Sequence, residues 1–459
     1  MTVDARTEAV QGMIDAAAKG RALMGGSDAM RDAGEVYLPK FKAEEQEDYN
    51  ARLSASWLFN GFKKTVKDMT GRVFDKPVEV ADAPEKIVAW AENIDMQGRD
   101  LSAFAKEIFK DGFVAGVGYI MADAPQREGD TTRAEAAQLG LRPYLVHLRV
   151  EDVLGWKTET YGNVLAFSQF RILETVSEPD PEDEFSQIDV QQVRVLDRTA
   201  EGVFVRIYRQ DDKGDWSTHD EYSTDAKEIT VVPYYAMRTG FATGEPVLED
   251  LADVNIAHWQ SQSDQRNILH FARVPILHVS GRDEDEALKI SAGTAAQSRN
   301  PDAKLSWVEH SGQAIGAGRT DLKDLEFQME ALGLQLLVSS NATATGSVLD
   351  NAKETSGLGM MADSLKDALE HAMGWMAFYG GLDEQSIAIV VNKDFGVVPL
   401  TAQEVTAMQK DVAMGYLSLE EYYEERKRRG VLRPDLDTQE DIDRVEASAP
   451  NLGEQDGGE

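Results

Sequence analysis

Cysteine is absent from the 459 residues. Its absence excludes disulfide bonds, thiolate metal sites and a cysteine nucleophile. Only seven histidines occur, so few nitrogen ligands remain for a metal ion. No stretch of about 18 apolar residues could span a bilayer, and residues 1–20 are charged and lack the apolar run of a signal peptide. We therefore expect a protein of the cytoplasm, unless a larger assembly carries it elsewhere.

Positive charge is also scarce, since 47 basic residues face 81 acidic ones and the net charge is −34. Such a surface does not hold a phosphate backbone by counterion release, so a tight DNA binder is not expected. An acidic surface can still serve nucleic acid by repelling it, because a wall along which DNA slides is better negative than positive. The length and the 42% hydrophobic content favour a folded chain with two or more domains.

Complete catalytic motifs are missing as well. GVGYIM, from Gly116, lacks the third glycine of a dinucleotide-binding turn, and GFKKT, from Gly61, lacks the upstream glycine of a phosphate-binding loop. TSGLG lacks the first glycine of a nucleophile elbow, so Ser356 is expected to be a loop serine. DDKGD, from Asp211, lacks the twelve-residue pattern of a calcium loop and is predicted to be a hairpin turn.

The histidines do not form a metal-binding pattern. His258, His270 and His278 lie 12 and 8 residues apart, so no pair has the i, i+4 spacing. We predict that the protein is not an enzyme, and we expect no metal and no cofactor. The alternative, an acidic cytosolic hydrolase that uses Ser356 or a carboxylate pair, needs a buried site that the sequence does not reveal.

Helical periodicity dominates residues 1–125, where one core-facing helix is predicted to end near Gly71 and Pro77. Its periodic positions are Leu53, Trp57, Phe62, Val66 and Met69. A later helix is predicted to continue through Phe113 into a strand at residues 118–122.

From Arg142 to Pro233 the pattern changes to β-branched and aromatic runs, which predict a mostly antiparallel meander. Turn signals separate the strands at Gly162-Asn163, at Glu201-Gly202 and at DDKGD. The acidic segment EPDPEDEF, residues 178–185, is predicted to be a loop.

Two long helices follow, one at residues 246–274 and one at residues 320–340, with a compact segment between them. The first begins near Pro246 and ends before Pro275, but residues 260–267 in its middle are entirely polar. The second has a narrow heptad seam formed by Leu322, Leu325, Met329, Leu332 and Leu336. The helices form either a hairpin inside one globule or a rod that packs against copies of itself. The polar middle favours the second interpretation, because a polar face needs water or a polar channel beside it.

Small and polar residues fill 341–359, and a methionine-rich helix is predicted at residues 360–379. A strand, SIAIVV, follows, and the capping boxes TAQE at Thr401 and SLEE at Ser418 predict two further helices. The tail after Ala447 is expected to be disordered.

The order of these parts resembles the portal proteins of tailed bacteriophages, in particular a subfamily known only as a domain of unknown function. The resemblance runs from about Tyr37 to Glu446. It is carried by NGFKKTVKDMTGRVFDKPV, DGFVAGVGYIMAD, VEDVLGW, IAHWQSQSDQRNILHFARVPILHVSG and ETSGLG.

The resemblance implies an α+β portal fold with a helical and β-rich wing at residues 1–245. Residues 246–274 and 320–340 would be the stem helices, 275–319 the clip, and 341–359 the tunnel loop. Residues 360–400 would return to the wing, and residues 401–459 would form a short crown with a disordered tail.

The same resemblance implies candidate channel-lining and clip-contact residues. The channel candidates are Gln262, Arg266, Lys323, Asn341, Thr343, Thr345, Ser347, Asp350 and Lys353. The clip candidates are Arg282, Asp283, Glu284, Lys289, Arg299, Lys304 and Trp307.

As a portal protein, the chain would form a homo-oligomeric ring of about twelve subunits at one capsid vertex of the virion, after assembly in the host cytoplasm. Double-stranded DNA would pass through the ring during packaging and ejection, without sequence specificity. The implied protein partners are the terminase large subunit, the head-tail adaptor, and the major capsid and scaffolding proteins, and no membrane is involved. The alternative within the structural class is another ring of the virion neck, such as an adaptor.

Overall fold

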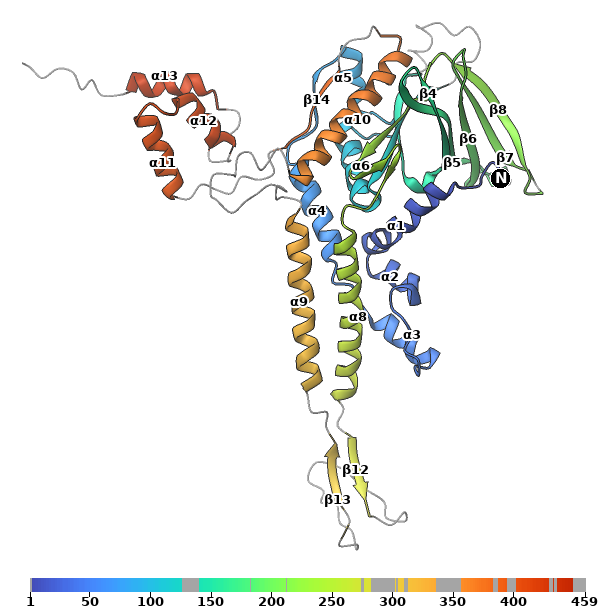
Figure 1. Ribbon diagram of the computed structural model, residues 1–459, viewed down its shortest axis with the longest axis vertical. Helices are drawn as coiled ribbons and strands as arrows, with labels where there is room; N and C mark the ends of the chain where they lie inside the picture. Colours follow the sequence, from blue (N-terminus) through green and yellow to red (C-terminus); the bar gives the residue numbers. More distant parts are fainter. Residues whose placement is uncertain are drawn as a thin grey trace, which may run out of the picture.

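The computed structural model describes residues 2–125, 140–181, 183–211, 213–273, 276–281, 302, 304–308, 313–335, 356–382, 387–393, 402–428, 432 and 436–448. These residues build an α+β body, a rod of two helices with a β-hairpin beyond its end, and a group of three C-terminal helices (Figure 1). In the described part of the chain, no helix is both long enough and apolar enough to cross a membrane.

The N-terminal part of the body is mainly helical, as predicted. Its helices are α1 (Glu8–Gly25), α2 (Ser27–Ala33), α3 (Gln46–Ala55), α4 (Gly61–Val73), α5 (Glu85–Ala91) and α6 (Leu101–Ala115), with a 3-10 turn η1 (Gly34–Val36). The single helix predicted to contain both Leu53 and Met69 is wrong, because α3 and α4 are separate. Asn60 starts α4 as its N-cap by accepting a hydrogen bond from the Lys63 amide at 2.8 Å. Trp57 lies in the break and is 42% exposed, so it is not a core residue.

A three-stranded antiparallel sheet, in the order β3-β2-β9, lies in the core of the body. Its strands are β2 (Val117–Asp123), β3 (Tyr144–Leu148) and β9 (Val231–Tyr235). The strand predicted at residues 118–122 is therefore confirmed. Helices α6 and α10 (Gly357–Tyr379) pack against this sheet, and Phe104, Phe109 and Phe113 of α6 are fully buried. Large aromatic side chains such as these each remove a large apolar area from water when they are buried.

The larger sheet has five antiparallel strands in the order β4-β5-β6-β7-β8, which confirms the predicted meander. The strands are β4 (Val153–Tyr161), β5 (Val164–Pro179), β6 (Gln187–Arg198), β7 (Val203–Gln210) and β8 (Trp216–Thr224), and a 3-10 turn η2 (Val150–Asp152) precedes them. Strands β4 and β8 were not predicted, because much of their length is polar and exposed. They are the two edge strands of the sheet, and their polar stretches, KTET in β4 and STHDE in β8, lack the apolar run that predicts a strand.

The DDKGD turn between β7 and β8 confirms the predicted hairpin. The Asp211 carboxylate accepts hydrogen bonds from the amides of Lys213 at 2.8 Å and Asp215 at 3.0 Å. Gly214 has a φ of +83°, a conformation that favours glycine.

Two short pairs complete the body. Strand β1 (Glu79–Asp82) pairs antiparallel with β14 (Ala388–Val390), so the predicted strand SIAIVV has its partner more than 300 residues earlier. The mainly helical interpretation of residues 1–125 missed β1, because four residues carry little periodic signal. Strands β10 (Arg238–Gly240) and β11 (Thr243–Gly244) form a small hairpin before the rod.

Helix α10 (Gly357–Tyr379) returns to the body after the rod. It begins three residues before the predicted start at Met360, because the Ser356 hydroxyl accepts a hydrogen bond from the Gly359 amide at 3.1 Å and caps the helix. Residues 357–359 are therefore helical, which corrects their assignment to the loop. The predicted tunnel loop was residues 341–359. Its first part, residues 341–355, lies outside the described residues.

The C-terminal helices are α11 (Ala402–Ala413), α12 (Leu419–Arg428) and α13 (Thr438–Ser448). In the SLEE box, the Ser418 hydroxyl accepts a hydrogen bond from the Glu421 amide at 3.1 Å, as a helix N-cap does. Helix α13 was not predicted as a separate element. Thr401 of the TAQE box and the tail from residue 449 lie outside the described residues.

Candidate functional site

The rod consists of α8 (Glu249–Ala272) and α9 (Gln313–Gln335), which lie side by side (Figure 1). Strands β12 (Ile276–Ser280) and β13 (Lys304–Val308) form an antiparallel hairpin beyond its end. Helix α8 lies within the range predicted for the first long helix. The start predicted for the second, Thr320, is wrong, because α9 already begins at Gln313.

Glycine explains the misplaced start of α9. Gly316 and Gly318 lie in the compact segment that was predicted to precede Thr320, and glycine is a poor helix former. In the structure, a Cβ on Gly318 would lie 2.2 Å from the Gln265 Oε1 atom of α8. The glycine therefore lets the two helices approach closely, and tertiary packing outweighs its low helix propensity.

Asn255 joins the N-terminal part of α8 to the body by hydrogen bonds. Its side chain is fully buried, accepts a hydrogen bond from the Phe62 amide at 2.8 Å and donates one to the Phe59 carbonyl at 2.8 Å. The Phe62 amide belongs to the first turn of α4, where amides have no partner within the helix. Asn255 therefore joins α8 to the start of α4 and gives the buried Phe62 amide a hydrogen-bond partner.

The polar middle of α8 serves contacts within the chain. Gln260 donates to the Tyr37 carbonyl at 2.9 Å, Ser263 accepts from the Ser56 hydroxyl at 2.9 Å, and Gln265 donates to the Ile315 carbonyl of α9 at 2.9 Å. The interpretation that this stretch is polar because it faces a hydrated channel is thus wrong for these three side chains. They are polar because they meet hydroxyl and backbone groups of neighbouring segments.

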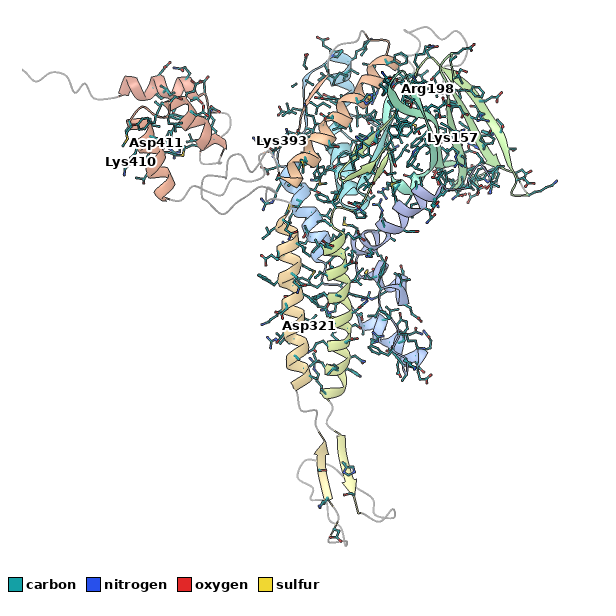
Figure 2. The ribbon with its side chains drawn as sticks, viewed as in Figure 1. Lys157, Arg198, Asp321, Lys393, Lys410 and Asp411 are labelled. Carbon is teal, nitrogen blue, oxygen red and sulfur yellow. The ribbon has the colours of Figure 1, made fainter. Side chains whose placement is uncertain are left out.

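A further hydrogen bond ties α8 to α9, from the Ser261 hydroxyl to the Asp321 carboxylate at 2.6 Å. Figure 2 labels Asp321 on the rod.

Arg52 of α3 lies beside Ser263 and Asp264 of α8. Its side chain is buried and pairs with Glu44 through two hydrogen bonds of 2.7 and 2.8 Å. The hydrogen bonds from Arg52 lower the pKa of Glu44 below its ordinary value, although burial opposes this.

His258 occupies the buried junction of α8, α9 and the loop before α4. Its ring centroid lies 5.1 Å from that of Phe59, and its Nε2 atom lies 3.5 Å from a Glu326 carboxylate oxygen. Burial lowers the pKa of His258, and the nearby Glu326 and Asp321 carboxylates oppose that shift only in part. The neutral imidazole is therefore favoured at this position.

The two faces of α9 differ in their surroundings. Met329, in the predicted seam, is buried, while Leu322, Leu325 and Leu332 are half-buried. Leu336 lies outside the described residues. On the opposite face, Phe327 is 72% exposed and Leu334, seven residues later, is 49% exposed. Sequence reasoning missed this second apolar face, although its i, i+7 spacing was visible.

The structure describes three of the predicted channel-lining residues. Gln262 on α8 is half-buried, whereas Arg266 on α8 and Lys323 on α9 are exposed. Within the described part of the chain, no hydrogen bond or ion pair joins these three side chains. The other channel candidates lie outside the described residues, namely Asn341, Thr343, Thr345, Ser347, Asp350 and Lys353.

Two of the predicted clip residues are described. Lys304 is exposed at the start of β13, and Trp307 of the same strand pairs in register with Leu277 of β12. The remaining clip candidates lie outside the described residues, namely Arg282, Asp283, Glu284, Lys289 and Arg299.

Ser356, the candidate nucleophile, is buried and its hydroxyl caps α10, so it is not the loop serine that was expected. Among the described residues, no group of three or more histidine and carboxylate side chains is arranged to hold a metal ion.

Residues 247–380, from the start of the rod to the end of α10, match the model of a family described as a domain of unknown function (DUF4055). No curated protein matches the chain.

Among solved structures, the chain is similar to one in the neck of an empty GTA particle computed with C6 symmetry, with a TM-score of 0.41 and 13% identity. It is also similar to a chain in the virion of a native gene transfer agent (GTA) particle, with a TM-score of 0.40 and 11% identity. A third similar chain lies in the neck of a native GTA particle computed with C12 symmetry, with a TM-score of 0.39 and 13% identity. Each pair covers 81% of this chain and 89% of the other chain.

Proposed function

We propose that the protein is a phage portal protein, a ring of about twelve copies at one capsid vertex that forms the channel for double-stranded DNA. The observation that carries the proposal is the rod. Helices α8 and α9 extend from a broad α+β body and lead to a hairpin beyond their end (Figure 1). A ring of such rods would enclose a channel, and the hairpins would form one rim of it.

The uncovered face of α9 supports packing between copies. Phe327 is 72% exposed and Leu334 is 49% exposed on a helix whose other face already contacts α8. Large apolar side chains grouped on one exposed helix face are typical of interaction sites. In the proposed ring, the neighbouring subunit covers them.

Charge supports the passage of DNA without stable binding. Twelve copies at −34 each sum to about −400 before counterions, and such a field repels the duplex from the channel wall. Arg266 and Lys323 are exposed on the rod. If they face the channel, they supply brief phosphate contacts that depend on salt.

We further propose that the protein has no enzymatic activity, and that the hairpin rim meets the terminase large subunit during packaging and the head-tail adaptor afterwards. The body contacts the major capsid and scaffolding proteins in this arrangement, and the location is the virion. Another neck ring remains the alternative within the structural class, and it differs in that it would not bind the packaging motor.

The test is negative-stain electron microscopy of the purified protein with class averaging, combined with mass photometry of the same sample. We expect rings with a central hole and a mass near twelve or thirteen times 50.7 kDa.

The variant Phe327→Asp should not form rings, because a carboxylate would enter the contact between subunits. The control Val164→Asp changes another exposed apolar residue, which lies on β5 away from the rod, and should keep them. A uniform monomer or dimer that persists at high concentration, and with scaffolding or capsid protein added, would contradict the proposal.

A further inference from the structure

The five-stranded sheet carries a basic pocket in a strongly acidic protein. The pocket has a volume of about 380 Å³, and its lining contains three cationic side chains and no carboxylate. Strands β4 to β7 line most of the pocket, with Lys157, Gln169, Arg171, Val195, Arg206 and Tyr208 among the lining residues. We call this set the basic pocket.

The cations of the basic pocket differ in how far they are neutralised. Arg206 pairs with Asp197 and donates to the Tyr208 hydroxyl at 2.8 Å. Arg171 donates to the Val3 carbonyl at 2.7 Å, and burial lowers its pKa while the charge of Asp4 opposes the shift. Lys157 is exposed and makes no hydrogen bond or ion pair with any described residue. Figure 2 labels it on this sheet. The pocket therefore has positive charge available for an anionic partner.

The turn between β5 and β6 has the complementary character. Its described acidic residues are Asp180, Asp183 and Glu184, and Glu178 lies just before it at the end of β5, paired with Arg209 at 2.8 Å. The loop predicted at residues 178–185 therefore begins two residues too early. We call residues 178–181 and 183–186 the acidic tip. Phe185, in this tip, is 90% exposed, more than any other large apolar side chain that the structure describes.

Hydrogen bonds hold the acidic tip in one shape. The Asp183 carboxylate accepts from the Phe185 amide at 3.0 Å, the Ser186 amide donates to the Asp183 carbonyl at 3.1 Å, and the Asp180 amide donates to the Ser186 carbonyl at 3.1 Å. A turn ordered in this way presents Phe185 at little further entropic cost on binding.

The acidic tip cannot reach the basic pocket of its own chain. Arg171 lines the pocket and Pro179 ends the same strand β5 eight residues later. At about 3.3 Å per residue, the two are roughly 26 Å apart. Any tip that enters the pocket must come from another copy.

We propose that the acidic tip of one subunit docks into the basic pocket of the next subunit, with Phe185 against the half-buried Tyr208 and the tip carboxylates beside Lys157 and Arg171. The inference rests on the proposed ring. The two patches are different surfaces of one chain, so the contact is head-to-tail, and repetition of such a contact closes a ring when the rotation between copies permits.

The absence of cysteine makes a direct test possible. Glu184→Cys and Gln169→Cys are prepared as two separate variants, mixed, assembled and oxidised. A disulfide forms only where Cα atoms come within about 7 Å. We expect covalent dimers in the ring fraction, with a yield at least tenfold above that of the control pair Glu184→Cys and Lys227→Cys, in which the second cysteine replaces an exposed lysine outside the pocket. Adding Lys157→Glu to the Gln169→Cys variant should reduce the yield several-fold.

The outcomes separate this inference from the proposed function. Rings that form normally but cross-link no better than the control pair overturn the tip-and-pocket contact and leave the portal proposal standing. A wild-type protein that forms no assembly overturns both. Rings with a high cross-linking yield that is insensitive to Lys157→Glu overturn the electrostatic basis of the contact.

Discussion

His258 illustrates how burial at a single residue sets a dependence on pH. Its side chain is almost completely buried between α8, α9 and Phe59, and burial lowers its pKa. The unfolded chain has a histidine pKa of about 6.5. Between the folded value and 6.5, the unfolded chain binds more protons, so the free energy of unfolding falls as the pH is lowered through this range.

We predict that His258→Leu makes the protein less sensitive to acid. Relative to wild type, the free energy of unfolding of the variant should rise as the pH falls from 7 toward 5, because the variant has no buried imidazole to protonate. Urea denaturation at several pH values measures this. His219→Leu, which removes an exposed histidine on β8, is the matched control and should keep the wild-type profile. Parallel pH curves for wild type and His258→Leu would refute the prediction.

At the scale of the element, the rod depends on close approach of two helices with polar contacts between them. Gln265 of α8 bonds to the Ile315 carbonyl and lies against Gly318. Gly316, two residues earlier on α9, has open space where a Cβ would be. An alanine methyl group at Gly316 would therefore point into open space, whereas one at Gly318 would collide with Gln265.

We predict that Gly316→Ala stabilises the protein by about 1 kcal/mol, because alanine is the better helix former. Gly318→Ala should lose that gain, because the new methyl group displaces Gln265 and its hydrogen bond, which contributes about 1 kcal/mol. Denaturant unfolding of both variants gives the two values. Equal stabilisation by both substitutions would show that Gln265 moves aside at no cost.

At the scale of the whole molecule, the net charge governs the relation to DNA. The surplus of acidic residues, 81 against 47 basic ones, opposes the long-range attraction on which non-specific DNA binding depends. The basic pocket on the sheet is a local exception, and we infer that it serves a contact between subunits.

We predict that the purified protein binds linear double-stranded DNA with a Kd weaker than about 10⁻⁴ M at physiological salt, the weak end of non-specific binding. Fluorescence anisotropy of a labelled duplex, titrated with the assembled protein, measures this. A Kd below about 10⁻⁶ M that weakens steeply with salt would mean that exposed cations such as Arg266 and Lys323 dominate the surface reached by DNA.

The sequence by itself determined the properties that depend on composition and local pattern. The absence of cysteine, the acidic charge, the existence of both long helices, the antiparallel meander and the DDKGD hairpin were all predictable, because charge counts, helical periodicity and turn chemistry act over a few neighbouring residues. The Ser418 cap of α12 belongs to the same group, since a cap and its amide lie three residues apart.

Only the tertiary structure decided which partners the polar side chains meet. Residues 260–267 were predicted to need water or a polar channel beside them, yet Gln260 and Ser263 bond to segments more than 200 residues away in sequence. The early start of α9 depends on contact between Gly318 and Gln265, and the basic pocket requires β4 to β7 to lie side by side. Such contacts join residues that are distant in the chain, so no local pattern contains them, and packing sets them only when the whole chain folds.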